Sequence, residues 1–269
     1  MKVHHVSKVL ATDLDGTLIP LKDNAENKGD LIQLERALRE NNVTLTFVTG
    51  RHLESVQDAI ERYALPTPDW VICDVGTSIY QRTDDDSFQI AQPYVDHLQS
   101  IVGEVSTSRL REEFASLESL RVQEEEKQGP FKLSFYCDAK RLHEVHDAVL
   151  DQLTHRRLPY SLISSVDPFN GDGLIDLLPT DVSKAHALQW WTDHAGMDNR
   201  QLVFSGDSGN DLAAMTAGYR TIVVGNASAE LMETVHQHYE ARMQLDRLYL
   251  AEKTATSGVL AGCRHFGLI

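Results

Sequence analysis

The segment DLDGT near the N-terminus places two carboxylates, Asp13 and Asp15, directly after an apolar run. Side chains two residues apart point the same way from an extended backbone, so both carboxylates can face one ligand. A second acidic pair, Asp207 and Asp211, stands in GDSGND after another apolar run. Mg²⁺ prefers oxygen ligands and keeps several waters. The two segments therefore predict a magnesium site that takes one carboxylate from each, a backbone carbonyl and a phosphate oxygen.

Two other residues have side chains that suit a phosphate group. Thr49, in VTGR, can donate its hydroxyl hydrogen to a phosphoryl oxygen. Lys184, in DVSKAHAL, stands at the start of an expected helix, where the helix dipole already favours anions. Because the metal would relieve the repulsion among the carboxylates, Asp13 could then attack phosphorus. The four segments together predict phosphoryl transfer through an aspartate.

The charge balance restricts the partners of this chain of 269 residues. Forty acidic and 25 basic side chains give a formal net charge of -15, and no basic tract offsets it. Such a field repels nucleic acid and anionic lipid, so we expect neither as a partner. It also repels a phosphorylated substrate, so a phosphate site needs local cations, either a metal or a placed Lys or Arg.

Five short apolar runs lead into the polar segments, and we expect each to be a buried parallel strand. They are KVLAT up to Asp13, LTFVT up to Gly50, WVICD up to Gly76, LVFSG up to Asp207 and TIVVG up to Asn226. Helical periods lie between them, one on Leu31, Leu34, Ala37 and Leu38 behind Asp30 as N-cap, another on Val56, Ala59, Ile60 and Tyr63. This alternation predicts an α/β fold with a doubly wound parallel sheet, whose ligands bind at the carboxyl ends of the strands.

The alternation of strand and helix stops after Tyr80. Further along, FKLSFY (131–136) and YSLISS (160–165) have the pattern of antiparallel strands, with helical stretches around them. We therefore expect an inserted α+β cap domain over residues 82–172, which two linkers would allow to hinge. Residues 1–81 and 173–269 would form the catalytic core.

The three cysteines, Cys73, Cys137 and Cys263, are far apart and show neither CxxC nor Cys/His spacing. This pattern favours reduced thiols over a disulfide framework or a structural zinc site. The N-terminus has no long apolar signal region, and no stretch approaches 18 apolar residues. We expect a cytoplasmic protein that does not enter membranes.

Two other readings of the acidic motifs are possible. In an EF-hand loop that begins at Asp13, the sixth residue would be Leu18 instead of Gly and the twelfth Asn24 instead of Glu, so that reading fails. A receiver-type signalling domain also combines carboxylates, a Thr and a Lys. Its phosphoacceptor lies on a middle strand, however, whereas here the acidic pair follows the first strand.

The segments DLDGT, VTGR, SKAHA and GDSGND resemble, in this order, the four motifs of the haloacid dehalogenase (HAD) superfamily. Within it the chain resembles the sucrose-phosphate phosphatase family. That resemblance is carried by PDWVICDVGTSIY, FKLSFY, DLLPTDVSKAHAL, SGDSGNDLAAM and TATSGVLAGCRHF. It implies a HAD-like, Rossmannoid core with an inserted cap and a sugar-phosphate phosphatase activity.

The resemblance also implies a role for each matched residue. Asp13 would be the nucleophile, and Asp15 the acid that protonates the leaving sugar oxygen and then the base that activates water. Asp13, the backbone carbonyl of Asp15, and Asp207 would hold Mg²⁺, while Asp211 would orient these ligands. The residues implied in phosphate and sugar binding are Thr49, Gly50, Arg51, Lys132, Lys184 and Asn210.

One position departs from the family pattern. Ser78 stands where sucrose-phosphate phosphatases commonly carry Glu, which removes a carboxylate from the expected sugar side of the site. The small-molecule substrate could therefore be sucrose 6-phosphate or another glycosyl phosphate, such as mannosylfructose phosphate or glucosylglycerol phosphate, supplied by a glycosyltransferase. A phosphosugar mutase on the same fold and a non-catalytic sugar-phosphate sensor are the alternatives.

Overall fold

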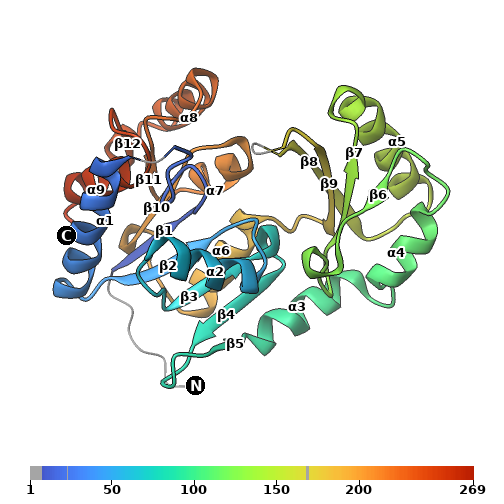
Figure 1. Cartoon of the computed structure of the whole chain (residues 1–269), viewed down its shortest axis with the longest axis horizontal. Coiled ribbons are helices and arrows are strands. Elements are labelled where there is room, and N and C mark those ends of the chain that lie inside the picture. Colours follow the sequence, from blue (N-terminus) through green and yellow to red (C-terminus); the bar gives the residue numbers. More distant parts are fainter. Residues whose placement is uncertain (1–7, 23, 168–169) are drawn as a thin grey trace. The chain divides into compact units, whose positions relative to one another are not determined.

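The computed structural model describes residues 8–22, 24–167 and 170–269 (Figure 1). The chain forms two compact units. The core unit contains the residues up to Ile90 together with Lys184–Ile269, and the cap unit contains Ala91–Ser183. The core is therefore made of two separate chain segments, as the sequence predicts.

The core unit is built on a sheet with the strand order β12-β11-β10-β1-β2-β3-β4-β5. Its parallel strands are β1 (Val9–Thr12), β2 (Thr44–Val48), β3 (Trp70–Cys73), β10 (Leu202–Gly206), β11 (Arg220–Val223) and β12 (Leu248–Leu250). Two antiparallel strands, β4 (Ser78–Arg82) and β5 (Phe88–Ile90), extend one edge. The five predicted strands are confirmed, and the predicted α/β class with a parallel doubly wound sheet is correct.

Helices cover both faces of this sheet. They are α1 (Ala25–Glu40), α2 (Leu53–Tyr63), α6 (Lys184–His194), α7 (Leu212–Met215), α8 (Ala229–Ala241) and α9 (Ala255–His265). Leu10 and Phe47 belong to a core cluster that also contains residues of α1, α2 and α9. Ala11 and Val48, the next residues along the same strands, are equally buried but lie outside that cluster. Successive strand residues point to opposite faces, so both faces are packed.

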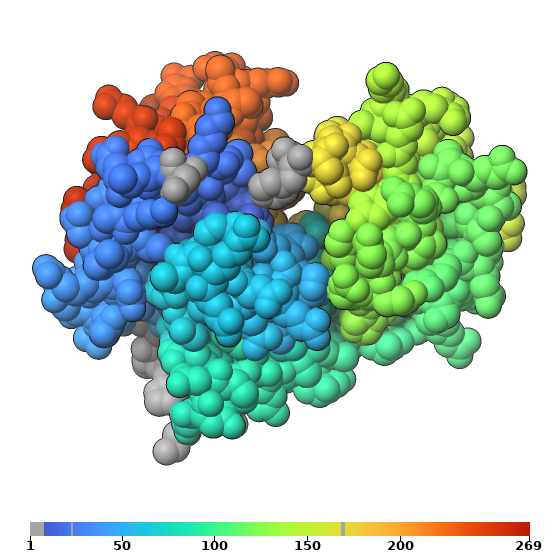
Figure 2. All heavy atoms as spheres, in the orientation of Figure 1, coloured from blue at the N-terminus to red at the C-terminus, as the bar shows by residue number. Residues whose placement is uncertain are grey.

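The first and last segments of the core unit lie side by side, as the blue and red ends of the chain show in Figures 1 and 2. Helix α1 begins at Ala25, and its N-cap is Asn24, whose side chain accepts from the Glu26 amide. The prediction of Asp30 as N-cap was wrong. The first turn of α1 is polar, and a contact with α9 stabilises it. In that contact the buried Asn27 side chain accepts a hydrogen bond from the Ser257 amide.

The cap unit is an α+β domain, as predicted. Its sheet has the order β6-β7-β9-β8, with all neighbours antiparallel. The strands are β6 (Arg121–Val122), β7 (Leu133–Cys137), β8 (Tyr160–Val166) and β9 (Gly173–Pro179), and the helices are α3 (Gln92–Val102), α4 (Thr107–Phe114) and α5 (Leu142–His155). Phe135 packs against Phe114 of α4, so the helices cover the face of β7 that carries Phe135.

The chain enters and leaves the cap unit later than the predicted limits of 82 and 172. Strand β5 pairs with β4, which keeps residues up to 90 in the core sheet. Strand β9 lies between β7 and β8, which keeps residues 173–179 in the cap sheet. Strand pairing over a long sequence distance decides both limits, and an apolar run does not reveal its partner.

All three cysteines are buried free thiols. Within the described parts of the chain, none of the helices combines the length and the apolar character that crossing a membrane requires.

Candidate active site

The carboxyl ends of three neighbouring parallel strands, β10, β1 and β2, bring the predicted residues together. The Asp13 amide donates to the carbonyl of Ser205 at 2.9 Å, so the β1 ladder continues one residue beyond the strand. Thr49 directly follows β2, and its amide donates to Ile72 at 2.8 Å. Asp207 follows β10, and Lys184 is the first residue of α6. Four separate segments therefore meet at one edge of the core sheet.

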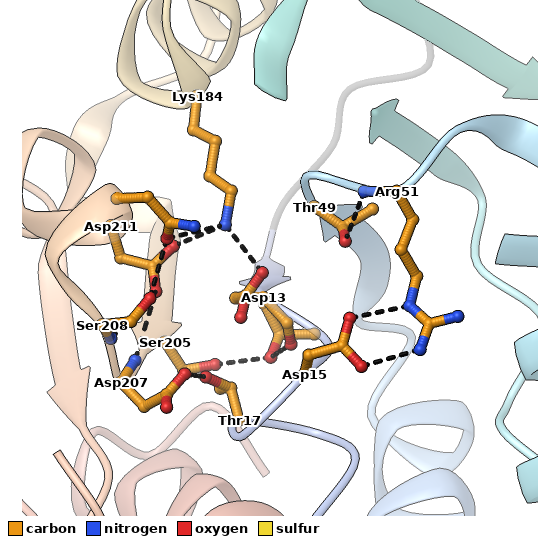
Figure 3. A network of polar contacts seen from close by, with 12 residues as sticks. Asp13, Asp15, Thr17, Thr49, Arg51, Lys184, Ser205, Asp207, Ser208 and Asp211 are labelled. Atoms are coloured by element: carbon orange, nitrogen blue, oxygen red, sulfur yellow. Dashed lines mark hydrogen bonds and ion pairs between the residues drawn. The ribbon is translucent and has the colours of Figure 1, made fainter. Parts of the chain in front are cut away.

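Lys184 lies at the centre of this cluster (Figure 3). Its Nζ donates to Asp13 Oδ1 at 2.7 Å, to Asp211 Oδ1 at 2.8 Å and to Asn210 Oδ1 at 3.2 Å. Burial and the nearby Asp211 raise the pKa of Asp13 to about 8, although Lys184 opposes the shift. Burial alone would lower the pKa of Lys184, but Asp13 and Asp211 raise it, so its ammonium stays charged.

Asp207 is held by residues from two other loops. Its Oδ1 accepts from the Thr17 hydroxyl at 2.8 Å, and its Oδ2 accepts from the Asn226 amide at 3.2 Å. Asn226 also donates to the Gly16 carbonyl at 2.9 Å. Gly16 has a φ of +84°, and a Cβ there would lie 2.3 Å from Asp207 Oδ2, so no larger residue fits. Burial raises the pKa of Asp207 to about 6.

Asp211 uses both of its carboxylate oxygens inside the protein. Oδ1 accepts from Lys184, while Oδ2 accepts from the amides of Asp207 at 3.2 Å and Ser208 at 3.3 Å. The Ser208 hydroxyl also donates to Oδ2 at 3.3 Å. Since Asp211 is fully buried and its oxygens are occupied, this geometry suits a residue that fixes the Asp207 loop.

The acidic cluster fits a divalent metal ion. Asp13, Asp207 and Asp211 each present a carboxylate oxygen, and these atoms lie within 4.8 Å of one another. Oxygen donors of this kind match the preference of Mg²⁺. Without a metal, burial and mutual repulsion raise the pKa values of Asp13 and Asp207. A bound dication would lower both pKa values again, because it attracts the ionised carboxylates.

Asp15 points away from the cluster, toward Arg51 (Figure 3). Arg51 Nε lies 2.7 Å from Asp15 Oδ2, and Nη2 lies 2.7 Å from Oδ1, which makes a bidentate ion pair. The Arg51 amide also donates to Thr49 Oγ1 at 3.2 Å. The Thr49 hydroxyl thereby accepts a bond from its own turn and can direct its hydrogen to an anion.

The turn after β3 supports the Thr49 turn at a conformational cost. The Asp74 amide donates to the Arg51 carbonyl at 2.8 Å, and the Val75 amide donates to the Thr49 carbonyl at 3.2 Å. Asp74 and Val75 both adopt left-handed backbone conformations, with φ of 53° and 59°. A β-branched residue is rare there, and such strain costs on the order of 1–3 kcal/mol and gathers at functional sites.

The core unit contains nine of the ten predicted site residues, and the tenth, Lys132, belongs to the cap unit. The nine are Asp13, Asp15, Thr49, Gly50, Arg51, Lys184, Asp207, Asn210 and Asp211. Three further residues that hold Asp207 and Asp211 were not predicted from the sequence: Thr17, Ser208 and Asn226. All three lie in polar loops that follow strands of the core sheet, and this position could have identified them as candidate site residues.

In the cap unit, Lys132 is 5% exposed and directly precedes β7. On that strand Ser134 donates to Asp176 Oδ1 at 2.5 Å, and Tyr136 donates to Glu124 Oε2 at 2.8 Å. Phe135 packs instead against α4. Strand alternation therefore assigns Ser134 and Tyr136 to the face opposite Phe135, and Lys132 precedes the first residue of this strand.

The chain matches known proteins along nearly its whole length. Residues 6–267 match the family model described as sucrose-6F-phosphate phosphohydrolase. A protein of Nitrosococcus oceani described as a HAD-like hydrolase is 34% identical over 96% of this chain and 71% of its own length. The mannosylfructose-phosphate phosphatase of Agrobacterium fabrum is 28% identical over 97% of both chains. The sucrose-phosphatase of Synechocystis sp. PCC6803, solved with sucrose and phosphate, superposes with a TM-score of 0.76 at 26% identity, over 97% of this chain and 98% of that one.

Proposed function

The chain belongs to the sucrose-6F-phosphate phosphohydrolase family of HAD phosphatases, and from that premise we propose that it hydrolyses a glycosyl phosphate through an aspartyl-phosphate on Asp13. The observation that carries the mechanism is the buried contact of Lys184 with both Asp13 and Asp211. The Lys184 ammonium can stabilise the negative charge of the Asp13 nucleophile and also that of an incoming phosphoryl group. The class of enzyme is sugar-phosphate phosphatase.

In the first step a carboxylate oxygen of Asp13 attacks phosphorus, and the bond between phosphorus and the sugar oxygen breaks. Lys184, Thr49 and the Gly50 turn bind the phosphoryl oxygens and balance their charge. Asp15 donates its proton to the sugar oxygen as that oxygen leaves. The products of this step are the free sugar and the aspartyl-phosphate.

In the second step Asp15, now ionised, takes a proton from a water molecule. The resulting hydroxide attacks phosphorus, and the bond from phosphorus to Asp13 breaks. Inorganic phosphate leaves, and the carboxylate of Asp13 is restored.

Mg²⁺ is the cofactor that the donor set favours. We assign its ligands to Asp13, Asp207 and the backbone carbonyl of Asp15, with Asp211 as the residue that orients them. When bound, the ion would neutralise charge on the phosphoryl group and favour the ionised form of Asp13. Thr17 and Asn226 keep Asp207 directed at this position.

We propose that the cap unit selects the sugar. Its polar sheet face carries Lys132, Ser134 and Asp176, which can bind hydroxyl groups. Ser78, at the start of β4, is a buried hydroxyl where the family resemblance implies a carboxylate. The names of the relatives support three candidates of one class: sucrose 6-phosphate, mannosylfructose phosphate and glucosylglycerol phosphate. A glycosyltransferase would supply each of them, and the free thiols fit a reducing cytoplasm.

Phosphate release from a panel of disaccharide and hexose phosphates, measured with Mg²⁺ and again with EDTA, tests the proposal. We expect Mg²⁺-dependent release from at least one glycosyl phosphate and none from Asp13→Asn. Isomerised sugar phosphate without free phosphate would identify a mutase. Binding without turnover would identify a sensor, and either result would refute the proposal.

A further inference from the structure

Two buried hydroxyl groups lie next to the proposed nucleophile. Thr12 is the last residue of β1, and Ser205 lies beside it in the parallel register of β10. Both residues are fully buried. The Ser205 hydroxyl donates to Thr12 Oγ1 at 2.8 Å, and the Thr12 hydroxyl donates to the Asp13 carbonyl at 2.8 Å. The two hydroxyls therefore form a chain that ends on the backbone of Asp13.

Both hydroxyls occupy positions where an apolar side chain would be expected. The row of paired residues across the sheet runs from Phe47 through Thr12 and Ser205 to Ile222. Phe47 and Ile222 belong to the apolar core cluster on this face. Strands buried on both faces usually carry continuous apolar residues, and burying a hydroxyl costs free energy unless it is hydrogen-bonded. The row thus contains two polar groups that the packing of the sheet does not require.

The backbone of Asp13 is held at both of its polar groups. Its amide donates to the Ser205 carbonyl at 2.9 Å, and its carbonyl accepts from the Thr12 hydroxyl. Ser205 therefore acts twice, through its carbonyl and through the hydroxyl that bonds Thr12. Hydrogen bonds in a chain polarise one another in a low-dielectric interior, which strengthens the contact with the Asp13 carbonyl. The chain thus fixes the peptide plane that follows Asp13.

The Asp13 side chain lies on the other face of the sheet. Val71 of β3 belongs to the core cluster, whereas its neighbour Trp70 packs against Trp191 of α6, with ring centroids 5.6 Å apart. Because successive strand residues point to opposite faces, α6 covers the face opposite the cluster. Lys184 of α6 contacts Asp13 at 2.7 Å. The nucleophile and the hydroxyl chain therefore lie on opposite sides of the β1 backbone.

The direction of the Asp13 carbonyl also sets that of the Leu14 amide. The peptide bond between these residues is trans, so its N–H points away from its carbonyl oxygen. Since the carbonyl points to the Thr12 hydroxyl, the Leu14 N–H points to the face that carries the Asp13 carboxylate. A backbone N–H in this position can donate to an oxygen of a phosphoryl group that meets the carboxylate.

We propose that Thr12 and Ser205 are positioning residues that hold the peptide plane between Asp13 and Leu14 during phosphoryl transfer. Through this plane they direct the Asp13 carboxylate at phosphorus and the Leu14 N–H at a phosphoryl oxygen. Both hydroxyls act through the backbone, and neither touches the substrate. The inference rests on the proposed function, in which Asp13 is the nucleophile.

The test removes the hydroxyls without changing the shape of the apolar row. Thr12→Val is nearly isosteric, and the double variant Thr12→Val/Ser205→Ala removes both partners of their mutual bond together. Replacing both partners of a buried hydrogen bond by apolar groups can be neutral or stabilising. We therefore expect the double variant to melt no more than about 4 °C below wild type. A purely structural role would instead lower the melting temperature further.

Activity should fall although the fold is kept. With saturating Mg²⁺ and 4-nitrophenyl phosphate, the double variant should lose about tenfold to a hundredfold in kcat, the effect of a small misplacement of reacting groups. Its KM should change by less than about threefold, since Lys184 and Thr49 remain in place. Orthovanadate, which can adopt the five-coordinate geometry of the transition state, should inhibit it about tenfold to a hundredfold more weakly.

Two further variants separate positioning from packing. Thr12→Ser restores the hydroxyl and should return kcat to within about threefold of wild type. Thr221→Val is the matched control, because Thr221 of β11 is also fully buried and its hydroxyl donates to the Met215 carbonyl at 3.0 Å. It should lower the melting temperature and leave kcat, KM and vanadate inhibition unchanged.

Three results would overturn the proposal. If the double variant keeps the kcat and the vanadate affinity of wild type, the hydroxyl chain does not position Asp13. If its kcat falls only together with its melting temperature, or if Thr221→Val loses kcat equally, the hydroxyls serve the fold alone. If wild type releases no phosphate from any phosphomonoester, or if Asp13→Asn still releases it, the proposed function fails and the inference fails with it.

Discussion

Lys184 Nζ lies 2.7 Å from Asp13 Oδ1, and the two side chains are only 1% and 6% exposed. An ion pair this deeply buried loses the hydration of both charges, and its Coulombic attraction must offset that loss. Asp211 adds a second carboxylate 2.8 Å from the same ammonium. When both carboxylates are ionised, the metal-free site holds one cation against two anions, an imbalance that raises the pKa of Asp13 and that an incoming dication can correct.

Replacing Lys184 with Met should destabilise the metal-free protein by about 3–5 kcal/mol, because removing one partner of a buried pair leaves the other uncompensated. Urea unfolding in EDTA measures this change, and phosphate release should disappear in the same variant. Lys253→Met is the control, since its pair with Glu26 at 2.9 Å is more than half exposed. The control should change stability by less than about 1 kcal/mol, and equal losses would contradict the buried-pair interpretation.

Asp13→Asn should have opposite effects on stability and on activity. Burial and Asp211 raise the folded-state pKa of Asp13 from 3.8 to about 8. A carboxyl with a raised pKa contributes stability that is fully present below its unfolded pKa and is lost as pH rises through the folded value. The wild-type protein in EDTA should therefore lose stability relative to Asp13→Asn between about pH 4 and pH 8.

Urea unfolding of both proteins at several pH values gives this difference, in which titrating groups remote from Asp13 cancel. Added Mg²⁺ should reverse the order at pH 8 by stabilising only the protein with the intact carboxylate. A difference that does not change with pH would mean that Asp13 keeps an ordinary pKa in the folded protein.

Local patterns in the sequence were sufficient to predict the core of the site. An apolar strand ends directly before Asp13, Thr49 and Asp207, and the parallel sheet brings strand ends together without further information. Contacts between side chains distant in sequence were not predictable in the same way. The pairing of Arg51 with Asp15 and the bonds from Asn226 to Gly16 and Asp207 depend on how loops fold after the strands have paired.

The same distinction explains the errors at element boundaries. Asp30 lies at the edge of an apolar period, yet α1 begins at Ala25 because Asn24 caps it and Asn27 contacts α9. The apolar segment Leu174–Leu178 looks like a return to the core, yet β7 and β8 enclose it in the cap sheet. In both cases a partner far along the chain decided the outcome.

Asp13→Asn and Asp15→Asn should differ in kind. Without Asp13 no phosphoenzyme can form, and a proposed metal ligand is lost. Asp15→Asn should retain Mg²⁺ binding, because its proposed metal contact is the backbone carbonyl, and should still form a phosphoenzyme slowly. Acid quenching with radiolabelled substrate and calorimetric Mg²⁺ titration measure the two properties. A labelled Asp13→Asn protein would show that another residue is the nucleophile.

Asn226→Ala should weaken Mg²⁺ binding by about tenfold to a hundredfold, the usual effect of removing a residue that orients a metal ligand. Asn226 bonds Asp207 Oδ2 and the Gly16 carbonyl through one end of its amide and accepts from the Ala255 amide through the other. It thereby links α9 to the acidic cluster. Calorimetric titration measures the affinity directly.

Asn41→Ala serves as the control for Asn226, because the Asn41 side-chain amide donates to the Ala37 carbonyl at the exposed end of α1. It should leave Mg²⁺ affinity unchanged. If Asn226→Ala binds Mg²⁺ with unaltered affinity, Asn226 serves only to hold α9 in place. The substitution would then lower the melting temperature without changing metal binding.

The last prediction is that Lys132 discriminates between substrates. The core residues bind phosphate and metal, which every phosphomonoester shares, so selection of the sugar requires other side chains. Lys132→Ala should lower kcat/KM for the natural glycosyl phosphate by about tenfold to a hundredfold, about 1.5–3 kcal/mol, since a charged donor to a hydroxyl is lost. 4-Nitrophenyl phosphate has no hydroxyls, so its kcat/KM should hardly change.

Two further variants serve as controls for this prediction. Lys132→Met, which keeps the buried stem, should behave like Lys132→Ala, and Lys140→Ala, at an exposed position, should match wild type on both substrates. Equal losses on both substrates would assign Lys132 to folding or phosphate binding, and no loss on either would remove it from the sugar site.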